Sequence, residues 1–444
     1  MCSLYRKIML KLINPLIDDM AVNMLTSKYS ETPFALLSVF QKLSPRVVME
    51  TGMRAESGKS LARPLGSPQV LSPWEKILLN PKQIFELPTQ SQKEVQTQTI
   101  IGPRCKKPLC LSMPIMITAM SLGASLNVPI KKALALGSGK AGTSTNTGES
   151  NVTPEERDNA KFLVGQINRA MRLTDERRLQ LVDAIEIQQG QGAWGGSSEI
   201  QDKVEDDYLE SIWNKPKGSY SVVSPRYPGV SSPDDFVAFV NSIKANYDVP
   251  VGIKIAGSDY IEYELEVIAK TNVDFITIDG AEGGTSGAPP TLEDDVGLPT
   301  LYSLARAVNW LEENNLKDKF QIIVAGGMKT PGEFIKALAM GADAVYIGSI
   351  ALMATMHTQI TKSLPSYPPT QLAIYTGKLA DQFDIEQGAH ALTNFLNSCK
   401  EEMKAVVQVI GKKETSKLSK EDLVSVDKEL AGIIGIRYAG SKRV

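Results

Sequence analysis

Two pairs of small residues, each placed directly after a short apolar run, are the first candidates for chemistry in this sequence. Gly326 and Gly327 end one run, and Gly348 and Ser349 end the next run along the chain. Glycine has no Cβ, so the backbone there can come close to a ligand. Backbone N–H groups at two such turns can converge on one phosphate without a cationic side chain. Tight strand-to-helix turns also need glycine, so the pattern alone leaves a phosphate site and a purely structural turn both open.

A third glycine-rich segment, IDGAEGGTSGAPP at 278–290, follows the preceding apolar run and carries Gly283, Gly284 and Thr285. It has little side chain to pack, which suits close approach to a flat or bulky ligand. A flexible surface loop would have the same composition. Taken together, three consecutive runs end in bare backbone, and a phosphorylated planar cofactor such as FMN explains all three.

Lys254 lies within the otherwise apolar run 251–255. An inward-facing lysine there could stabilise an anionic reduced flavin electrostatically. It could instead form a Schiff base with a carbonyl substrate, provided that burial lowered its pKa. A lysine that extends to solvent is the structural alternative. Lys254 is therefore our candidate for both a catalytic and a cofactor-binding residue.

The elements that must position these residues begin near residue 113. Short apolar or β-branched runs alternate there with longer segments of helical period, which indicates βαβ units and a parallel sheet. We expect strands at 114–120, 140–145, 184–188, 220–224, 251–255, 274–278, 321–325 and 344–348. Eight such units over roughly 240 residues fit an α/β fold of the (β/α)8 TIM-barrel type, with its active face at the carboxyl ends of the strands. An open doubly wound sheet is the alternative, but no G-x-G-x-x-G follows the first run.

Helical extensions flank the predicted barrel. We expect an N-terminal helical or irregular extension at 1–110, an FMN-binding barrel at 111–355 and a C-terminal helical segment at 356–444. The first residues predict an amphipathic helix, because charged residues and a proline interrupt their apolar run too often for a signal peptide or a membrane span. A cytoplasmic location is the corresponding expectation.

Composition limits the classes of partner. Lys plus Arg number 48 and Asp plus Glu number 50, a net charge of −2, which gives no electrostatic footprint for nucleic acid. Cys105 and Cys110 lack the His or Cys neighbours that would complete a set of metal ligands, so we expect ordinary thiols in a reducing compartment. The expected partners are a small-molecule substrate and further copies of the chain in a homo-oligomer.

Read in order, the motifs resemble those of a known family. ITAMSLGA (117–124), STNTGES (144–150), IEIQQGQGAWGG (185–196), VGIKIAG, IDGAEGGTSGAPP and IIVAGGMKT are similar to the FMN-binding synthase domain of glutamate synthase. With DLVSVDKELAGIIGIRYAG near the C-terminus, the whole chain resembles the stand-alone glutamate-synthase-like FMN proteins of prokaryotes. The resemblance implies a (β/α)8 barrel that carries FMN. In the family, reduced FMN passes a hydride to 2-iminoglutarate, formed from 2-oxoglutarate and ammonia, to give glutamate.

The resemblance also implies roles for individual residues. By similarity, Gln191 lies in the loop after the third strand and is a second candidate catalytic residue, while Lys254 faces the pyrimidine edge of the flavin. The remaining implied flavin neighbours are Ala119, Met120 and Ser121 at the end of the first strand, Asn146 near the ring, Gly283, Gly284 and Thr285 at the border of the site, and Gly326, Gly327, Gly348 and Ser349 around the phosphate.

The sequence departs from the family at several points. We expect no glutaminase domain, for which this chain has no room. No cysteine occurs at 351–378, where the family carries the ligands of a three-iron cluster, so no iron–sulfur cluster is expected. Gln188 and Trp194 stand where the family usually has lysines, and both changes remove positive charge near the place where a dicarboxylate would bind.

The leading hypothesis is an FMN-dependent oxidoreductase that acts on a CH–NH2 group, with electrons from a reduced nicotinamide, ferredoxin or a partner protein. A hydroxy-acid oxidase needs a histidine base, but His357 and His390 lie beyond the last predicted strand. A cysteine-dependent nucleotide dehydrogenase is not supported either, because no cysteine lies within the predicted strands. A non-redox FMN isomerase, a Schiff-base lyase that uses Lys254 and a flavin-binding subunit without its own chemistry remain as alternatives.

Overall fold

The computed structural model describes residues 2–32 and 35–443, and the chain forms two compact units, Met1–Ala62 and Arg63–Val444. The first unit contains helices α1 (Cys2–Thr26) and α2 (Ala35–Ser57), so a helix is present where the N-terminal sequence predicts one. No helix in the described ranges combines the length and the apolar content that crossing a membrane requires. The three-part division into 1–110, 111–355 and 356–444 stays a prediction.

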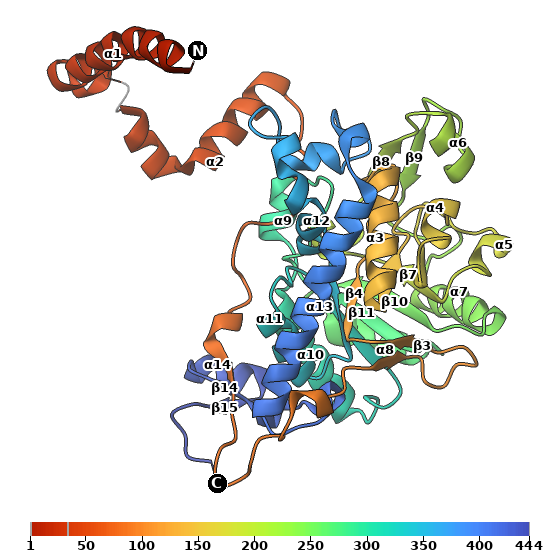
Figure 1. Ribbon diagram of the computed structural model, residues 1–444. Coiled ribbons are helices and arrows are strands. Elements are labelled where there is room, and N and C mark those ends of the chain that lie inside the picture. The colour runs from red at the N-terminus through yellow and green to blue at the C-terminus, as the bar shows by residue number, and fades with distance from the viewer. Residues whose placement is uncertain (1, 33–34, 444) are drawn as a thin grey trace. The chain divides into compact units, whose positions relative to one another are not determined.

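Eight parallel strands form a nearly closed barrel in the second unit (Figure 1). Around the sheet they are β4 (Ile115–Ile117), β13 (Ala344–Ile347), β12 (Gln321–Ala325), β11 (Phe275–Asp279), β10 (Val251–Ala256), β7 (Ala184–Gln188), β6 (Phe162–Ile167) and β5 (Ser144–Asn146). Each strand pairs with its neighbours in the barrel sequence, and helices flank the sheet. The predicted α/β fold, a (β/α)8 TIM barrel with helical extensions, is confirmed.

One of the eight predicted strands is wrong. The segment at 220–224 forms β9 (Tyr220–Val223), which pairs antiparallel with β8 (Ile200–Lys203) outside the barrel. Residues along β9 alternate between exposed and buried, which is typical of a strand with one wet face. The true third strand is β6, which has no counterpart among the predicted strands and is buried along all but its first residue. Gln191 therefore follows the fourth barrel strand, β7, and not the third.

Helices connect the barrel strands and follow the last of them in the chain. In chain order they are α3 (Val128–Ala141), α4 (Pro154–Arg157), α5 (Glu176–Leu179), α6 (Asp207–Trp213), α7 (Pro233–Asn246), α8 (Ile261–Ala269), α9 (Pro290–Asp295), α10 (Thr300–Glu313), α11 (Pro331–Ala339) and α12 (Ser349–Met356). Isoleucines at alternate positions, such as Ile185 and Ile187 on β7, lie under these helices in the main hydrophobic core. This alternation places the residues between them inside the barrel.

The inside of the barrel changes from apolar to polar along the strands. At the amino ends, the hairpin of β2 (Thr99–Ile101) and β3 (Leu109–Leu111) contributes Ile101 to an inner cluster with Phe275. A Cβ on Gly252 would lie 2.2 Å from the Phe275 ring, so the ring fills that layer. Toward the carboxyl ends the buried inner residues are Gln166, Glu186, Lys254 and Thr277. The fold therefore holds a polar layer directly under its carboxyl-terminal rim.

The C-terminal part packs against the barrel and against the segment that precedes it. Helix α13 (Ile385–Val409) lies beside α3 (Figure 1) and buries one face, which includes Leu392, Leu396 and Met403. Beyond it, β14 (Leu423–Ser425) pairs with β1 (Ile77–Leu79) and with β15 (Arg437–Tyr438), and α14 (Lys428–Ile434) lies between β14 and β15 in the chain. Segments before and after the barrel thus share one small sheet.

Candidate functional site

A cavity of about 770 Å³ opens at the carboxyl ends of the barrel strands. Its wall contains twelve of the thirteen residues assigned to the flavin site by resemblance, with Asn146 as the exception. The twelve are Ala119, Met120, Ser121, Gln191, Lys254, Gly283, Gly284, Thr285, Gly326, Gly327, Gly348 and Ser349. The structure thus brings these residues to one place, while their individual roles stay predictions.

Asn146 lies beneath the cavity wall. Its side chain is buried, with 1% of its surface exposed. Its Nδ2 donates to Glu186 Oε1 at 3.2 Å, and its Oδ1 accepts a hydrogen bond from the N–H of Gly148 at 2.9 Å. Asn146 therefore holds the turn after β5 and one oxygen of Glu186.

The glycine corner combines left-handed backbone with two helix N-termini. Gly326 and Gly327 have φ values of +110° and +65°, which favour glycine. A Cβ on Gly326 would lie 2.5 Å from Thr300 Oγ1, so close packing against the start of α10 also requires this glycine. Helix α11 begins a few residues after Gly327, and α12 begins at Ser349. Helix N-termini favour anions, so the corner has the character of a phosphate site.

Lys254 is an ion-paired residue in the cavity wall. It is 3% exposed, and its Nζ lies 3.0 Å from Asp279 Oδ2. Burial lowers the pKa of Lys254, but Asp279 and Glu186 more than offset this effect, so the pKa stays above its ordinary value. The side chain is therefore a cation at neutral pH. A cation stabilises a nearby anion, whereas Schiff-base formation requires the neutral amine.

Glu186 connects the polar layer below the cavity. Besides Asn146, its carboxylate accepts hydrogen bonds from Gln166 Nε2 and Thr277 Oγ1, each at 2.8 Å. Gln166 lines the cavity, and its Oε1 is buried with no hydrogen-bond partner among the described residues. The sequence reasoning missed Gln166 because β6 was not predicted. A polar residue inside the apolar run FLVGQI was the available signal.

Glu149 is a second residue that the sequence reasoning did not single out, although it lies within the quoted motif STNTGES. It lines the cavity on the loop after β5. Burial raises the pKa of Glu149; Arg172 offsets part of this effect, and Asp202 adds to it. Its Oε1 is buried and has no hydrogen-bond partner in the described part of the chain. Such a carboxyl group keeps its proton to a higher pH than an ordinary glutamic acid does and can serve as a proton donor.

Residues 65–72 form a strap that closes one side of the cavity. The N–H of Arg63 donates to the carbonyl of Ala288 at 2.8 Å, and the N–H of Leu65 donates to the carbonyl of Thr285 at 2.9 Å. The guanidinium of Arg63 also contacts Glu293 at 2.7 Å. The strap is therefore held against the glycine-rich loop 278–290. No residue pattern in the sequence predicts this contact between the strap and the loop.

The fold and the site together define a (β/α)8-barrel protein with a ligand cavity at the carboxyl ends of its strands. The family described as "Conserved region in glutamate synthase" matches residues 73–413. The chain therefore belongs to the glutamate synthase family.

Individual relatives match long stretches of this chain. A glutamate synthase large subunit-like protein of Rhizobium meliloti is 29% identical, over 85% of this chain and 90% of that protein. An archaeal-type glutamate synthase (NADPH) of Thermotoga neapolitana is 30% identical, over 74% of this chain and 64% of its own length. The chain thus spans less than two thirds of the Thermotoga protein.

Solved structures share the fold. The recombinant flavin-binding domain of baker's yeast flavocytochrome b2 superimposes with a TM-score of 0.53 at 16% identity, over 86% of this chain and 83% of that chain. A mutant flavocytochrome b2 with benzoylformate gives 0.54 at 16% identity, over 96% and 95% of the two chains. At this identity the likeness shows the barrel fold.

Proposed function

We propose that this chain binds FMN in the cavity and acts as an oxidoreductase on an amine or imine, with 2-iminoglutarate from 2-oxoglutarate and ammonia as the candidate substrate. One observation carries the proposal: residues from six separate motifs of a glutamate synthase resemblance line a single cavity at the strand ends of a barrel. Membership of the glutamate synthase family supports the same chemistry.

The residues present fit a phosphorylated, planar ligand. The corner at Gly327 and Ser349 offers backbone and two helix N-termini to a phosphate. Lys329 lies in the same wall and adds a cation that the sequence reasoning did not name. Elsewhere in the wall, Gln166 Oε1 and Tyr346 Oη are buried and have no hydrogen-bond partner among the described residues, so they are available to the polar edge of a ring.

Bound FMN would supply the hydride chemistry that side chains lack. In this site the cationic Lys254 would stabilise negative charge on the reduced ring. Glu149, with its raised pKa, would hold a proton for the nitrogen of an imine or accept one from an amine. Gln191 and Trp194, also in the wall, would orient the substrate. The strap at 65–72 would limit access of water.

Our proposal for the electron donor rests on the name of a relative and not on residues of the site. The Thermotoga relative carries NADPH in its name, so a reduced nicotinamide is our first candidate and an electron-donor protein our second. The homo-oligomer, the cytoplasmic location and the absence of an iron–sulfur cluster stay predictions.

The Schiff-base lyase is disfavoured by the ion pair between Lys254 and Asp279, which keeps the amine protonated. A non-redox FMN isomerase and a flavin-binding subunit share the cofactor site, so the two experiments below separate them from an oxidoreductase.

The first experiment is an absorption spectrum of purified protein after incubation with FMN and desalting. Flavin bands at about 370 and 450 nm are expected to remain with the protein. The second mixes photoreduced protein anaerobically with 2-oxoglutarate and ammonia. Reoxidation of the flavin with formation of glutamate is expected. A bound flavin whose reduced form is reoxidised by no imine tested, and whose oxidised form is reduced by no amine tested, would falsify the oxidoreductase proposal.

A further inference from the structure

Among the residues that the structure describes, the barrel has one seam without ladder hydrogen bonds, between β4 and β5, the two ends of the eight-stranded sheet order. Both strands lead into loops that line the cavity, through Met120 and Ser121 after β4 and through Gly148 and Glu149 after β5. The relative position of these two loops therefore depends on contacts other than strand pairing.

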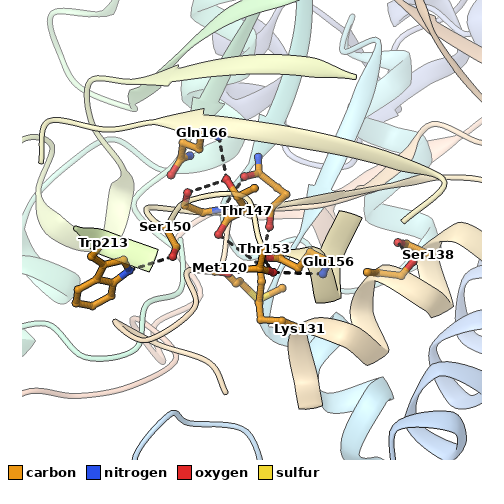
Figure 2. A network of polar contacts seen from close by, with 12 residues as sticks. Met120, Lys131, Ser138, Thr147, Ser150, Thr153, Glu156, Gln166 and Trp213 are labelled. Carbon is orange, nitrogen blue, oxygen red and sulfur yellow. Dashed lines mark hydrogen bonds and ion pairs between the residues drawn. The ribbon is translucent and has the colours of Figure 1, made fainter. Parts of the chain in front are cut away.

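Lys131 on α3 supplies such a contact. Its side chain is 1% exposed. Its Nζ donates to the carbonyl oxygen of Met120 at 2.6 Å (Figure 2). It also donates to the carbonyl oxygen of Asn146 at 2.7 Å. A single ammonium thus joins the chain after β4 to the last residue of β5.

Glu156 balances the buried charge of Lys131. Its Oε1 lies 2.8 Å from Lys131 Nζ, and the Glu156 side chain has no exposed surface. Thr153 caps α4 and donates to Glu156 Oε2 at 3.2 Å, which fixes the carboxylate. A buried charge needs a partner of this kind, because an unpaired one would be strongly destabilising.

The two loops also touch directly. A Cβ on Gly148 would lie 2.4 Å from the backbone nitrogen of Ser121. The network continues to the cavity floor, since the N–H of Gln166 donates to Thr147 Oγ1 at 3.0 Å (Figure 2). A shift of the Lys131 ammonium would therefore move backbone that lines the cavity.

We propose that Lys131 is a positioning residue for the flavin site. Its ammonium fixes the carbonyls of Met120 and Asn146 across the open seam, and this holds the two loops at the spacing that the flavin ring requires. The inference rests on the proposed function, because the ligand that it positions is FMN.

The test compares FMN dissociation constants of purified proteins. K131M/E156Q removes the bridge without leaving a buried charge, and its FMN affinity is expected to fall about 10- to 100-fold, the range found when outer-shell partners of a bound metal are removed. E156Q alone keeps the donors to both carbonyls but leaves the charge of Lys131 unpaired, so its melting temperature is expected to fall. The FMN affinity of the folded E156Q protein is expected to stay within about threefold of wild type.

A matched control lies at the other end of the barrel. Lys244 Nζ is 2.6 Å from Asp274 Oδ2, next to the start of β10. K244M/D274N removes this ion pair and is expected to lower the melting temperature while FMN affinity and the visible circular dichroism of the bound flavin stay unchanged. In K131M/E156Q both flavin readouts should change.

The outcomes separate the two proposals. If wild-type protein binds no FMN, the proposed function is wrong and this inference falls with it. If K131M/E156Q binds FMN as tightly as wild type and with the same visible circular dichroism, Lys131 has only a structural role and this inference alone is wrong. If that variant does not fold, K131L/E156L, which replaces the buried pair with apolar side chains and likewise keeps no donor, takes its place, and unchanged FMN affinity would again overturn the inference.

Discussion

The two halves of the cavity rim are built from different parts of the chain. After β11, β12 and β13 the wall is largely backbone, with Gly283, Gly326 and Gly348 at the strand ends. After β5 and on β6 and β10 it is made of side chains, including Glu149 and Lys254.

The difference separates two kinds of recognition. Backbone N–H groups at helix N-termini attract an anion at any pH, since they carry no titratable group. The side-chain half holds groups whose pKa values are shifted by burial and by neighbours. We therefore expect changes in the glycine half to remove cofactor binding and changes in the side-chain half to alter turnover and its pH dependence.

Ser349→Asp should give the largest effect. It places a carboxylate at the first position of α12, where an acidic residue suits the helix but would repel a bound phosphate. Like-charge contacts cost several kcal/mol, so FMN affinity is expected to fall about 10³-fold with an unchanged melting temperature. Fluorescence titration with FMN measures the loss. Ser349→Ala is the control, and its FMN affinity should stay within about tenfold of wild type, because the backbone groups remain. Wild-type FMN affinity in the aspartate variant would show that the phosphate does not bind at this corner.

Lys254→Met should leave FMN bound and lower kcat about 10²- to 10³-fold, as expected for loss of a preorganised charge beside the reacting group. The pH dependence gives a sharper comparison. Because the pKa of Lys254 is raised, activity that needs its cation should persist as pH rises past the ordinary lysine value of 10.5.

In Asp279→Asn the ion pair is lost while burial and Glu186 remain, so the pKa of Lys254 should fall below its value in wild type. The alkaline loss of activity should then move to lower pH than in wild type. Coincident pH profiles for the two proteins would show that the Lys254 cation is not needed.

Glu149→Gln should lower turnover about 10²-fold, within the range for loss of a general acid, and leave FMN binding intact. Burial raises the pKa of Glu149 above its ordinary 4.5. If the protonated form is required, wild-type activity falls as pH rises through that raised value, and the glutamine variant lacks this fall. A pH–rate profile from about pH 5 to about pH 9, the range around such a catalytic pKa, checks the fall in wild type and its loss in the variant. If the glutamine variant shows the same fall in activity with rising pH, a group other than Glu149 causes it.

Trp194→Lys should have the smallest effect. It restores a cation in the wall, at a position where the family usually has lysine, and should lower KM for 2-oxoglutarate about tenfold, the value of one charge-assisted hydrogen bond. Trp194→Met is the matched control without charge. Equal KM values in both variants would indicate that the substrate carries no second carboxylate.

Sequence reasoning was most successful in the glycine half of the rim. The runs at 274–278, 321–325 and 344–348 became β11, β12 and β13, since continuous apolar strands that end in glycine are a local signal. The glycines at their ends lie in the cavity wall as a group.

The side-chain half was harder to predict because its signals are not local. β6 contains Gly165 and Gln166, which break its apolar run, whereas β9 has a good apolar alternation but pairs outside the barrel. The pairing of Lys254 with Asp279 joins adjacent strands, and the raised pKa of Glu149 depends on burial by distant segments. Neither property can be read from the order of residues.

The strap has a practical consequence for protein engineering. The boundary between the two compact units falls at Ala62–Arg63, and Leu65 already lines the cavity. A shortened chain that starts at Arg63 keeps the hydrogen bonds to Thr285 and Ala288 and with them an intact cavity wall. A chain that starts after Ser72 lacks that wall. The choice of the first residue between Arg63 and Pro73 therefore decides whether a shortened protein keeps this side of its cavity.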